Sequence, residues 1–210
     1  MKTVDLKNRY EKEVIPQMMR DFGYTNKLQV PRIVKVTLNI GTSKTTGNPK
    51  LMDVMVNTLT RITGQKPVFT KARQSISAFK VREGQVVGMK VTLRGKRMTD
   101  FITRCINVAL PRVRDFQGIS PHSFDPAGKS YTLAFKEQIV LPEIKSDEID
   151  KLHGMEVTFS LSSSGIKESF ALMKMLGFPF RTEAQEQEYL ENVKRMKEAK
   201  RQRERARQRI

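Results

Sequence analysis

The chain has 210 residues, of which 38% are hydrophobic, so it can form a real core as one domain with appendages or as two small domains. Its 39 Lys and Arg residues outnumber 22 Asp and Glu residues, which gives a formal net charge of +17. A positive charge this large favours a permanent anionic partner, either nucleic acid or an anionic membrane surface.

A membrane or secreted location is disfavoured. No apolar run approaches the length of a transmembrane helix, and the charged residues at the start of the chain do not form a signal peptide. The single cysteine, Cys105, allows no intrachain disulfide, which favours a reducing cytosol. We therefore expect a cytoplasmic protein without a membrane partner.

The chain begins with a predicted amphipathic helix over residues 3–22. Pro16 is expected to kink this helix and Gly23 to end it. The prediction rests on apolar residues at near-helical spacing, namely Leu6, Tyr10, Val14, Met18 and Phe22.

A half-buried strand is predicted next, over residues 33–40, and a helix over 50–63 follows it after a polar loop. In the strand, four apolar residues alternate with three polar ones: Val34, Val36, Leu38 and Ile40 against Lys35, Thr37 and Asn39. One face of this strand should therefore meet the core and the other should meet solvent.

The middle of the chain predicts a short strand over 66–71, a basic loop over 72–84, a strand over 86–94 and a helix over 97–109 closed by Pro111. The strand over 86–94 alternates clearly, with Val87, Met89, Val91 and Leu93 facing one way and Gly88, Lys90, Thr92 and Arg94 the other.

The remaining predicted elements are a loop over 115–129, strands over 131–135 and 155–162, and a helix over 166–175. Strands and helices are mixed, and short loops are expected between consecutive strands. This order predicts an α+β fold with a mainly antiparallel sheet and helices packed on one face. The opposite face would then be polar and basic, since a strand shifted by one residue would bury its cations.

We expect two parts in the chain, an α+β domain over residues 1–182 and a charged, basic C-terminal extension over 183–210. The extension has high helix propensity and few large apolar residues, so it is predicted as a solvated helix or a disordered arm. It is either a solubilising tail or an RNA-binding arm, and we favour the arm.

The stretch from Gly64 to Arg97 holds nine Lys and Arg residues and a single acid, Glu83. One basic group lies in the loop over 72–84, and another lies on the polar side of the strand that follows. Each group alone is compatible with an ordinary solvated surface. Together, and with a loop that is long for a compact domain, they favour an RNA-binding surface.

No catalytic or cofactor-binding site is apparent. The segment from Gly41 to Gly47 lacks the spacing of a phosphate-binding loop, and His122 and His153 have no partner at metal-ligand spacing. Cys105 lies on the inward side of a predicted helix. We therefore expect a protein that is not an enzyme and has neither a cofactor nor a small-molecule substrate.

Several long segments resemble one known family. They are VPRIVKVTLNIG (30–41), TGQKPVFTKARQSISAFKVREG (63–84), GMKVTLRGKRM (88–98), LPRVRDFQGIS (110–120) and GFPF (177–180). The chain is similar over residues 3–181 to the bacterial large-subunit ribosomal protein five, or L-five, family. The extension after Arg181 departs from the family pattern.

The resemblance implies an α+β domain that binds 5S ribosomal RNA in the central protuberance, beside 23S ribosomal RNA and other 5S-associated proteins. It also implies a contact with the P-site tRNA and an intersubunit bridge to a protein of the small-subunit head. Residues 112–118 and 142–147 are the candidates for that bridge.

Two sets of site residues follow from the family motifs and from the polar strand faces. The 5S-binding set is Asn39, Gln65, Lys66, Lys90, Thr92 and Arg94. The tRNA-contacting loop holds Arg73, Gln74, Ser75, Ser77, Phe79, Lys80 and Arg82. Two alternatives are a non-ribosomal RNA-binding regulator or chaperone and an RNA-modifying enzyme, which would need a catalytic motif.

Overall fold

The computed structural model describes residues 6–42, 49–144, 152–182, 185–187 and 189. Five strands form one sheet: β1 (Ile33–Gly41), β2 (Val68–Lys71), β3 (Val86–Leu93), β4 (Ser130–Phe135) and β5 (Met155–Leu161). Their order is β2-β3-β1-β5-β4, and all four neighbouring pairs are antiparallel. This arrangement confirms the predicted α+β fold with an antiparallel sheet.

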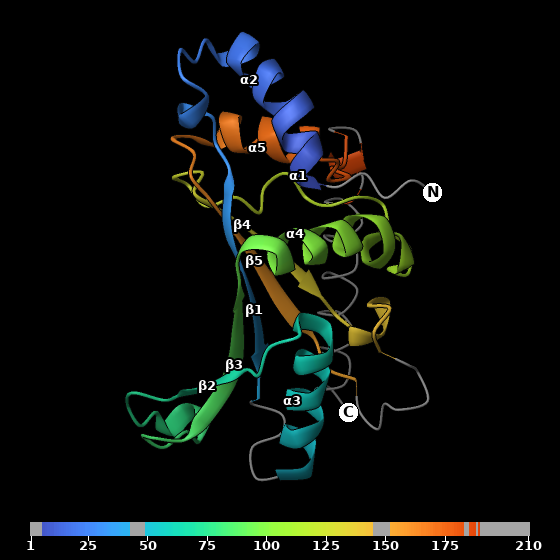
Figure 1. The fold of residues 1–210 in the computed structure, drawn as a ribbon. Helices are drawn as coiled ribbons and strands as arrows, with labels where there is room; N and C mark the ends of the chain where they lie inside the picture. The colour runs from blue at the N-terminus through green and yellow to red at the C-terminus, as the bar shows by residue number, and fades with distance from the viewer. Residues whose placement is uncertain (1–5, 43–48, 145–151, 183–184, 188, 190–210) are drawn as a thin grey trace, which may run out of the picture.

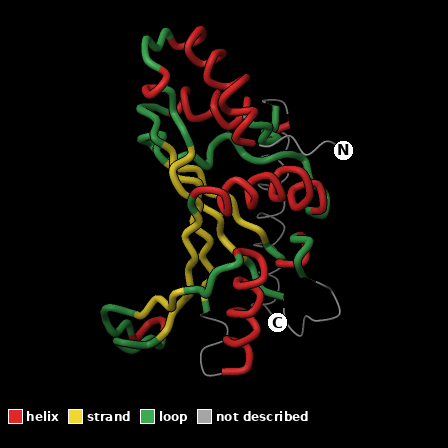
Figure 2. Tube along the Cα trace, viewed as in Figure 1, coloured by secondary structure: helices red, strands yellow, loops and turns green. Residues whose placement is uncertain are grey.

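Helices cover one face of the sheet and one of its ends. The main helices are α1 (Leu6–Arg9), α2 (Ile15–Phe22), α3 (Pro49–Thr63), α4 (Gly95–Arg104) and α5 (Ile166–Met175). Helices α3 and α4 lie on the same side of the sheet, whereas α1, α2 and α5 gather at one end (Figure 1). The opposite face of the strands carries no helix among the described residues, as the tube trace also shows (Figure 2).

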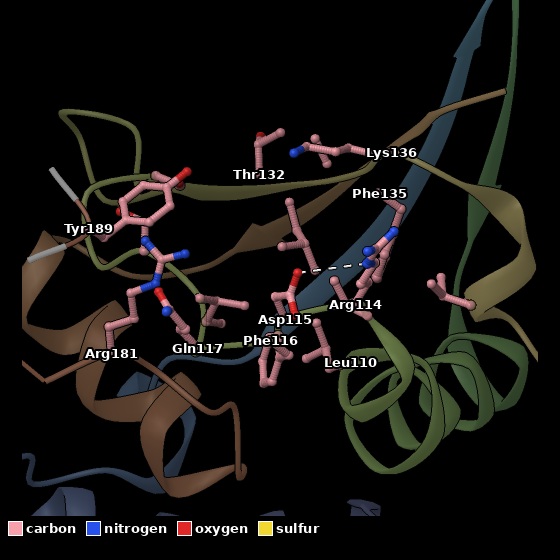
Figure 3. Close-up of a pocket in the computed structure, with 18 of the residues that line it drawn as sticks. Leu110, Arg114, Asp115, Phe116, Gln117, Thr132, Phe135, Lys136, Arg181 and Tyr189 are labelled. Atoms are coloured by element: carbon pink, nitrogen blue, oxygen red, sulfur yellow. Dashed lines mark ion pairs between the residues drawn. The ribbon is translucent and has the colours of Figure 1, made fainter. Parts of the chain in front are cut away.

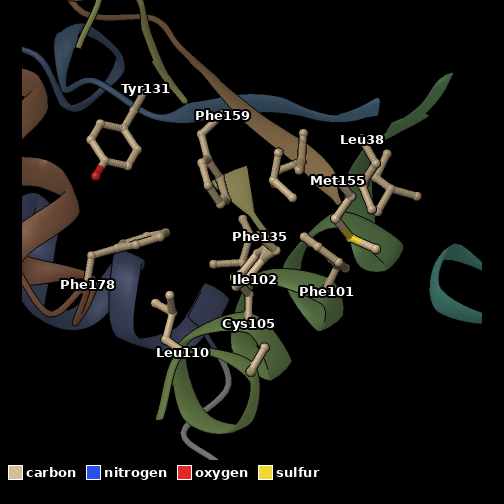
Figure 4. Close-up of a cluster of buried hydrophobic side chains, with 14 of the residues drawn as sticks. Leu38, Phe101, Ile102, Cys105, Leu110, Tyr131, Phe135, Met155, Phe159 and Phe178 are labelled. Carbon is tan, nitrogen blue, oxygen red and sulfur yellow. The ribbon is translucent and has the colours of Figure 1, made fainter. Parts of the chain in front are cut away.

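The core lies between the sheet and the helices that cover it. In β1 the alternation places Val36, Leu38 and Ile40 inward, and each is at most 1% exposed. They meet Phe101 and Ile102 of α4 in a cluster to which β4 and β5 also contribute (Figure 4). Full burial of each large apolar side chain contributes roughly 1.5–3 kcal/mol, so this cluster fixes which face of the sheet is left for solvent.

The N-terminal helix runs as predicted, with a local change of pitch. A single π-helical turn over Tyr10–Val14 joins α1 to α2, and Pro16 falls in the first turn of α2. The helix is continuous at this point, since Ile15 N donates to Tyr10 O, so Pro16, which has no N–H, leaves one intrahelical bond unmade where the π-helical turn passes into α2. Gly23 ends the helix in a left-handed conformation with φ of 69°, and its N–H donates to Met19 O.

Several details of the sequence prediction differ from the structure. Val34 is 40% exposed, since the register shifts between Ile33 and Lys35 at that end of β1, and Phe22 is 37% exposed. The helix predicted over 97–109 begins at Gly95 and changes to a π-helix over Cys105–Ala109. Strands β4 and β5 are joined by a long rather than a short connection, over 136–154, whereas the long loop predicted over 72–84 is present between β2 and β3.

Candidate nucleic-acid interface

Polar side chains form aligned rows across the helix-free face, because the strand register places them opposite one another. Asn39 of β1 lies opposite Lys90 of β3 on one side and Glu156 of β5 on the other. The next row holds four threonines from four adjacent strands, Thr92, Thr37, Thr158 and Thr132. The face therefore presents ammonium, amide, carboxylate and hydroxyl groups side by side, which suits hydrogen bonding to irregular RNA.

Glu156 is a feature of this face that the sequence analysis missed. The face was expected to be almost purely cationic or neutral, but Glu156 is exposed near its centre and accepts a hydrogen bond from Asn39 Nδ2 at 3.5 Å. The alternation of Met155–Leu161 contains the signal, since Glu156 lies between two buried positions. A carboxylate there excludes phosphate from its immediate vicinity and accepts hydrogen bonds from donors.

Gln65 lies directly after the end of α3. Gly64 ends that helix with φ of 66°, and the Thr63 hydroxyl accepts the Gln65 backbone N–H at 3.2 Å. The Gln65 side-chain amide is then placed beside the end of β3, and both of its groups are satisfied when the nitrogen is oriented to donate to Thr92 O at 3.3 Å and the oxygen to accept from Arg97 Nη1 at 3.2 Å. The structure thus brings Gln65 next to Thr92, and it adds Arg97 to the set.

The predicted 5S-binding cations are free to meet an external anion. Lys66, Lys90 and Arg94 are all exposed, and none of them forms an ion pair within the part of the chain that the structure describes. Arg94 precedes α4 as its N-cap residue in an extended conformation. Unpaired surface cations beside hydrogen-bonding groups are the expected composition of a phosphate-contacting surface.

The loop over residues 72–84 is held by its own hydrogen bonds rather than by the core. Ala72 N donates to Gln85 O at 2.8 Å at its base, and Ile76 and Val81 exchange backbone hydrogen bonds near its tip. The Ser75 hydroxyl accepts from Glu83 N at 2.9 Å. Ser75 is therefore occupied in shaping the loop.

The tip of this loop is exposed and carries both cationic and aromatic side chains. Residues 77–79 form a short 3-10 turn followed by Lys80 in a left-handed conformation, with φ of 54°. Phe79 is 77% exposed, which is unusual for a ring of that size. The other predicted tRNA-contacting residues, Arg73, Gln74, Ser77 and Arg82, are exposed as well.

The two predicted sets lie on different parts of the molecule. Asn39, Lys90 and Thr92 lie on the open face of the central strands, while the loop over 72–84 is the turn of the β2–β3 hairpin, which projects beyond the sheet (Figure 1). Strand β2 is at one edge of the sheet. The basic stretch from Gly64 to Arg97 therefore divides into a strand surface and a projecting loop.

The first candidate bridge segment, over 112–118, lines a cavity at the other edge of the sheet. The cavity, of about 680 Å³, is lined by residues 113–120 and by β4, and the Arg114–Asp115 ion pair lies beside it (Figure 3). In the second candidate segment, Glu143 pairs with Arg104, so its carboxylate is already engaged. Residues 145–147 of that segment lie outside the described residues.

The described residues hold no cluster of His, Cys, Asp and Glu that would bind a metal ion. Cys105 is fully buried, and burial raises the pKa of its thiol to about 12, so the thiolate needed for nucleophilic chemistry is not formed at neutral pH. None of the helices described here is long and apolar enough to cross a membrane.

Two family models match consecutive parts of the chain. The model described as ribosomal protein L5 matches residues 26–82, and the model for the C-terminus of the same ribosomal family matches residues 86–180. The large ribosomal subunit protein uL5 of Heliobacterium modesticaldum is 51% identical over 178 residues, which cover 85% of this chain and 98% of that protein. The chain belongs to the ribosomal protein L5 family.

Other members of the ribosomal protein L5 family are similarly close. The uL5 proteins of Carboxydothermus hydrogenoformans and Desulforamulus reducens are 49% and 51% identical over 175 residues, which cover 83% of this chain and 97% and 96% of theirs. These relatives are structural proteins of the large ribosomal subunit and not enzymes, as the sequence analysis expected. The family resemblance of the sequence motifs is confirmed.

The L5 family match ends close to the start of the predicted extension. The second family model ends at Phe180, so residues 181–210 lie beyond it. Most of the predicted extension lies outside the described residues, which include only 185–187 and 189 of it. These four residues are helical.

Proposed function

We propose that this protein of the large ribosomal subunit binds 5S ribosomal RNA through the helix-free face of its sheet. The observation that carries the proposal is the pair of rows across that face, in which Lys90, Asn39 and Thr92 stand exposed side by side. Cations supply affinity for phosphates, while Asn39, Gln65 and Thr92 supply directional hydrogen bonds to sugars and base edges. A sheet face that no helix covers allows several nucleotides to be contacted at once.

The loop over 72–84 is proposed as a second RNA contact, directed at the P-site tRNA. Its support is its projection from the sheet, its exposed cations and the exposed ring of Phe79, which can rest on a base or sugar. The tRNA is a transient partner, which suits the projecting loop over 72–84, whereas 5S RNA is a permanent partner, which suits the broader helix-free face of the sheet.

The protein is further proposed to contact 23S ribosomal RNA and other 5S-associated proteins within the ribosome, and to bridge to the small-subunit head. The bridge proposal rests on the exposed segment around Arg114, whose side chain is 96% exposed. Subunit association by light scattering should weaken on Arg114→Ala if this segment forms the bridge.

The 5S proposal is tested by Asn39→Ala in the full chain, with Asn107→Ala as the matched control. Asn107 is an exposed asparagine in the π-helix on the covered side of the sheet. Binding of labelled 5S RNA should weaken for Asn39→Ala only. Equal affinities of the two variants would contradict the proposal. Absence of the protein from large subunits in a sucrose gradient would favour the non-ribosomal regulator instead.

A further inference from the structure

The helix-free face of the sheet is divided by charge between its two halves (Figure 2). On β1 and β3 this face carries two lysines, Lys35 and Lys90. Strands β4 and β5 contain no Lys or Arg. Their side chains on this face, called here the β4–β5 surface, are four hydroxyl residues, one alanine and one carboxylate: Ser130, Thr132, Ala134, Glu156, Thr158 and Ser160.

The register of β4 and β5 places hydroxyls opposite hydroxyls. Ser130 lies opposite Ser160, Thr132 lies opposite Thr158, and all four residues are partly exposed. The two threonine hydroxyls are hydrogen-bonded at 3.3 Å, so one donates within the pair and the other keeps its proton for an outside acceptor. Within the described residues, neither serine hydroxyl has a hydrogen-bond partner. The surface therefore offers both donors and acceptors to a ligand.

Strand β4 lies at the edge of the sheet, and its helix-free face has no charge. Proteins commonly protect an edge strand with charged side chains, especially Lys, or by covering it. The first half of β4 is covered at its edge by the preceding loop, since Thr132 N donates to Ser123 O at 3.2 Å. Strand propensity accounts for the threonines of the surface, but not for the pair of serines. An uncharged face of this kind suits contact with a partner.

Glu156 decides which part of an RNA fits this surface. Its Oε2 accepts from Asn39 Nδ2 at 3.5 Å, and its neighbour on the other side is Ala134, whose methyl group is too short to cover the carboxylate. A carboxylate accepts hydrogen bonds but repels phosphate, which is also an anion and an acceptor. The ribose 2′-hydroxyl both donates and accepts, and it is the group that distinguishes RNA from DNA. It therefore matches both the carboxylate and the hydroxyls.

We propose that the β4–β5 surface contacts ribose 2′-hydroxyls of 5S ribosomal RNA and selects RNA by its sugars. The inference rests on the proposed 5S-binding function and extends that site by two strands beyond β1 and β3. Phosphates then lie toward Lys35 and Lys90, and sugars lie toward β5 and β4, with neighbouring strands about 4.8 Å apart. The wide, shallow minor groove of an RNA helix displays 2′-hydroxyls, and a sheet face without helices can approach it.

The test asks whether the protein hydroxyls and the RNA 2′-hydroxyls act together. Thr132→Val and Thr158→Val are combined in the full chain, which removes two hydroxyls and keeps the β-branched shape that favours a strand. Binding is measured to ordinary 5S RNA and to two preparations that carry 2′-fluoro groups at either the pyrimidines or the purines. These lack the 2′ donor but keep every phosphate.

On ordinary 5S RNA, the double variant should bind about tenfold more weakly than wild type. On at least one 2′-fluoro preparation, wild type should already be weakened, and the double variant should lose less than about threefold more, because the same contacts are missing. Equal losses on all three RNAs would overturn the assignment to 2′-hydroxyls. No loss on ordinary 5S RNA would overturn the contact itself. Ser130→Ala combined with Ser160→Ala is a second variant, with the same expected pattern.

Two controls separate this inference from the 5S proposal. Thr103→Val changes a partly exposed threonine of α4, on the covered side of the sheet, and should bind all three RNAs as wild type does. The threonine double variant removes no charge, so its salt slope should equal that of wild type, and a lower slope would show that phosphates were contacted instead. If Asn39→Ala weakens 5S binding and the threonine double variant does not, the 5S proposal stands and this inference falls.

Discussion

Asn39 and Glu156 face each other across the β1–β5 pair, and the Asn39 amide nitrogen donates to the Glu156 carboxylate at 3.5 Å. This contact fixes which way the amide points, so the Asn39 oxygen is available as an acceptor. It also places a negative charge in the middle of a surface that is proposed to bind a polyanion. A carboxylate in that position favours base amino groups and 2′-hydroxyls as neighbours and disfavours phosphates.

Glu156→Gln should therefore lower the specificity of RNA binding. Removing the negative charge should raise the affinity for an unrelated RNA, while the loss of a charged acceptor should weaken the 5S complex. The ratio of the two affinities should fall about tenfold, the typical value of one hydrogen bond to a charged group. Parallel filter-binding titrations with 5S RNA and an unrelated duplex measure this ratio, and an unchanged ratio would contradict a role for Glu156 in discrimination.

Arg94→Ala should weaken 5S binding while leaving the fold intact, because Arg94 is exposed directly after β3 and has no ion pair in the described structure. The salt slope should decrease by about 0.7–0.9 if one phosphate contact is lost. Arg20→Ala on α2 is the control, since Arg20 is also an exposed arginine but lies on the helical end. The same affinity for wild type and Arg94→Ala throughout a salt titration would refute the assignment.

The loop can be tested without disturbing its shape. Lys80 has a left-handed backbone, which asparagine tolerates, so Lys80→Asn combined with Arg73→Ala removes two charges with little strain. We expect weaker P-site tRNA binding in reconstituted ribosomes and unchanged 5S binding. Glu83→Gln, in the same loop, should not weaken the tRNA contact. If 5S binding collapses in the double variant, the loop belongs to the 5S interface.

The sequence predicted the sheet well because each strand alternates between core and solvent. In β3, Val91 and Leu93 were expected inward and Lys90 and Thr92 outward, and the structure confirms this. Strand order was not predictable, since no pattern in the sequence indicates that β1 pairs with both β3 and β5. For this reason the threonine row and the place of Glu156 became visible only in the structure.

Local irregularities were less predictable than the strands. Pro16 predicted a kink, whereas the structure has a π-helical turn over Tyr10–Val14 directly before the helix that contains Pro16. The attachment of Glu186 to Ser120 joins residues 66 positions apart, and composition alone described that region as charged and solvated. Long-range contacts of this kind leave no periodic signal.

Cys105 provides a test of the buried core that is independent of RNA. Burial raises the pKa of its thiol from 9.0 to about 12, so in alkaline solution the unfolded chain loses this proton before the folded one does. The contribution of Cys105 should therefore lower the free energy of unfolding as pH rises above 9.0, by at most about 1.4 kcal/mol per pH unit up to about 12.

Urea unfolding of wild type and Cys105→Ala at several alkaline pH values isolates that contribution, because the lysines and tyrosines are common to both. The wild type should lose stability faster than the variant, although the variant starts lower from its small cavity. Parallel pH profiles, or rapid reaction of the native thiol with a disulfide reagent at pH 8, would show that Cys105 is not buried as the structure has it.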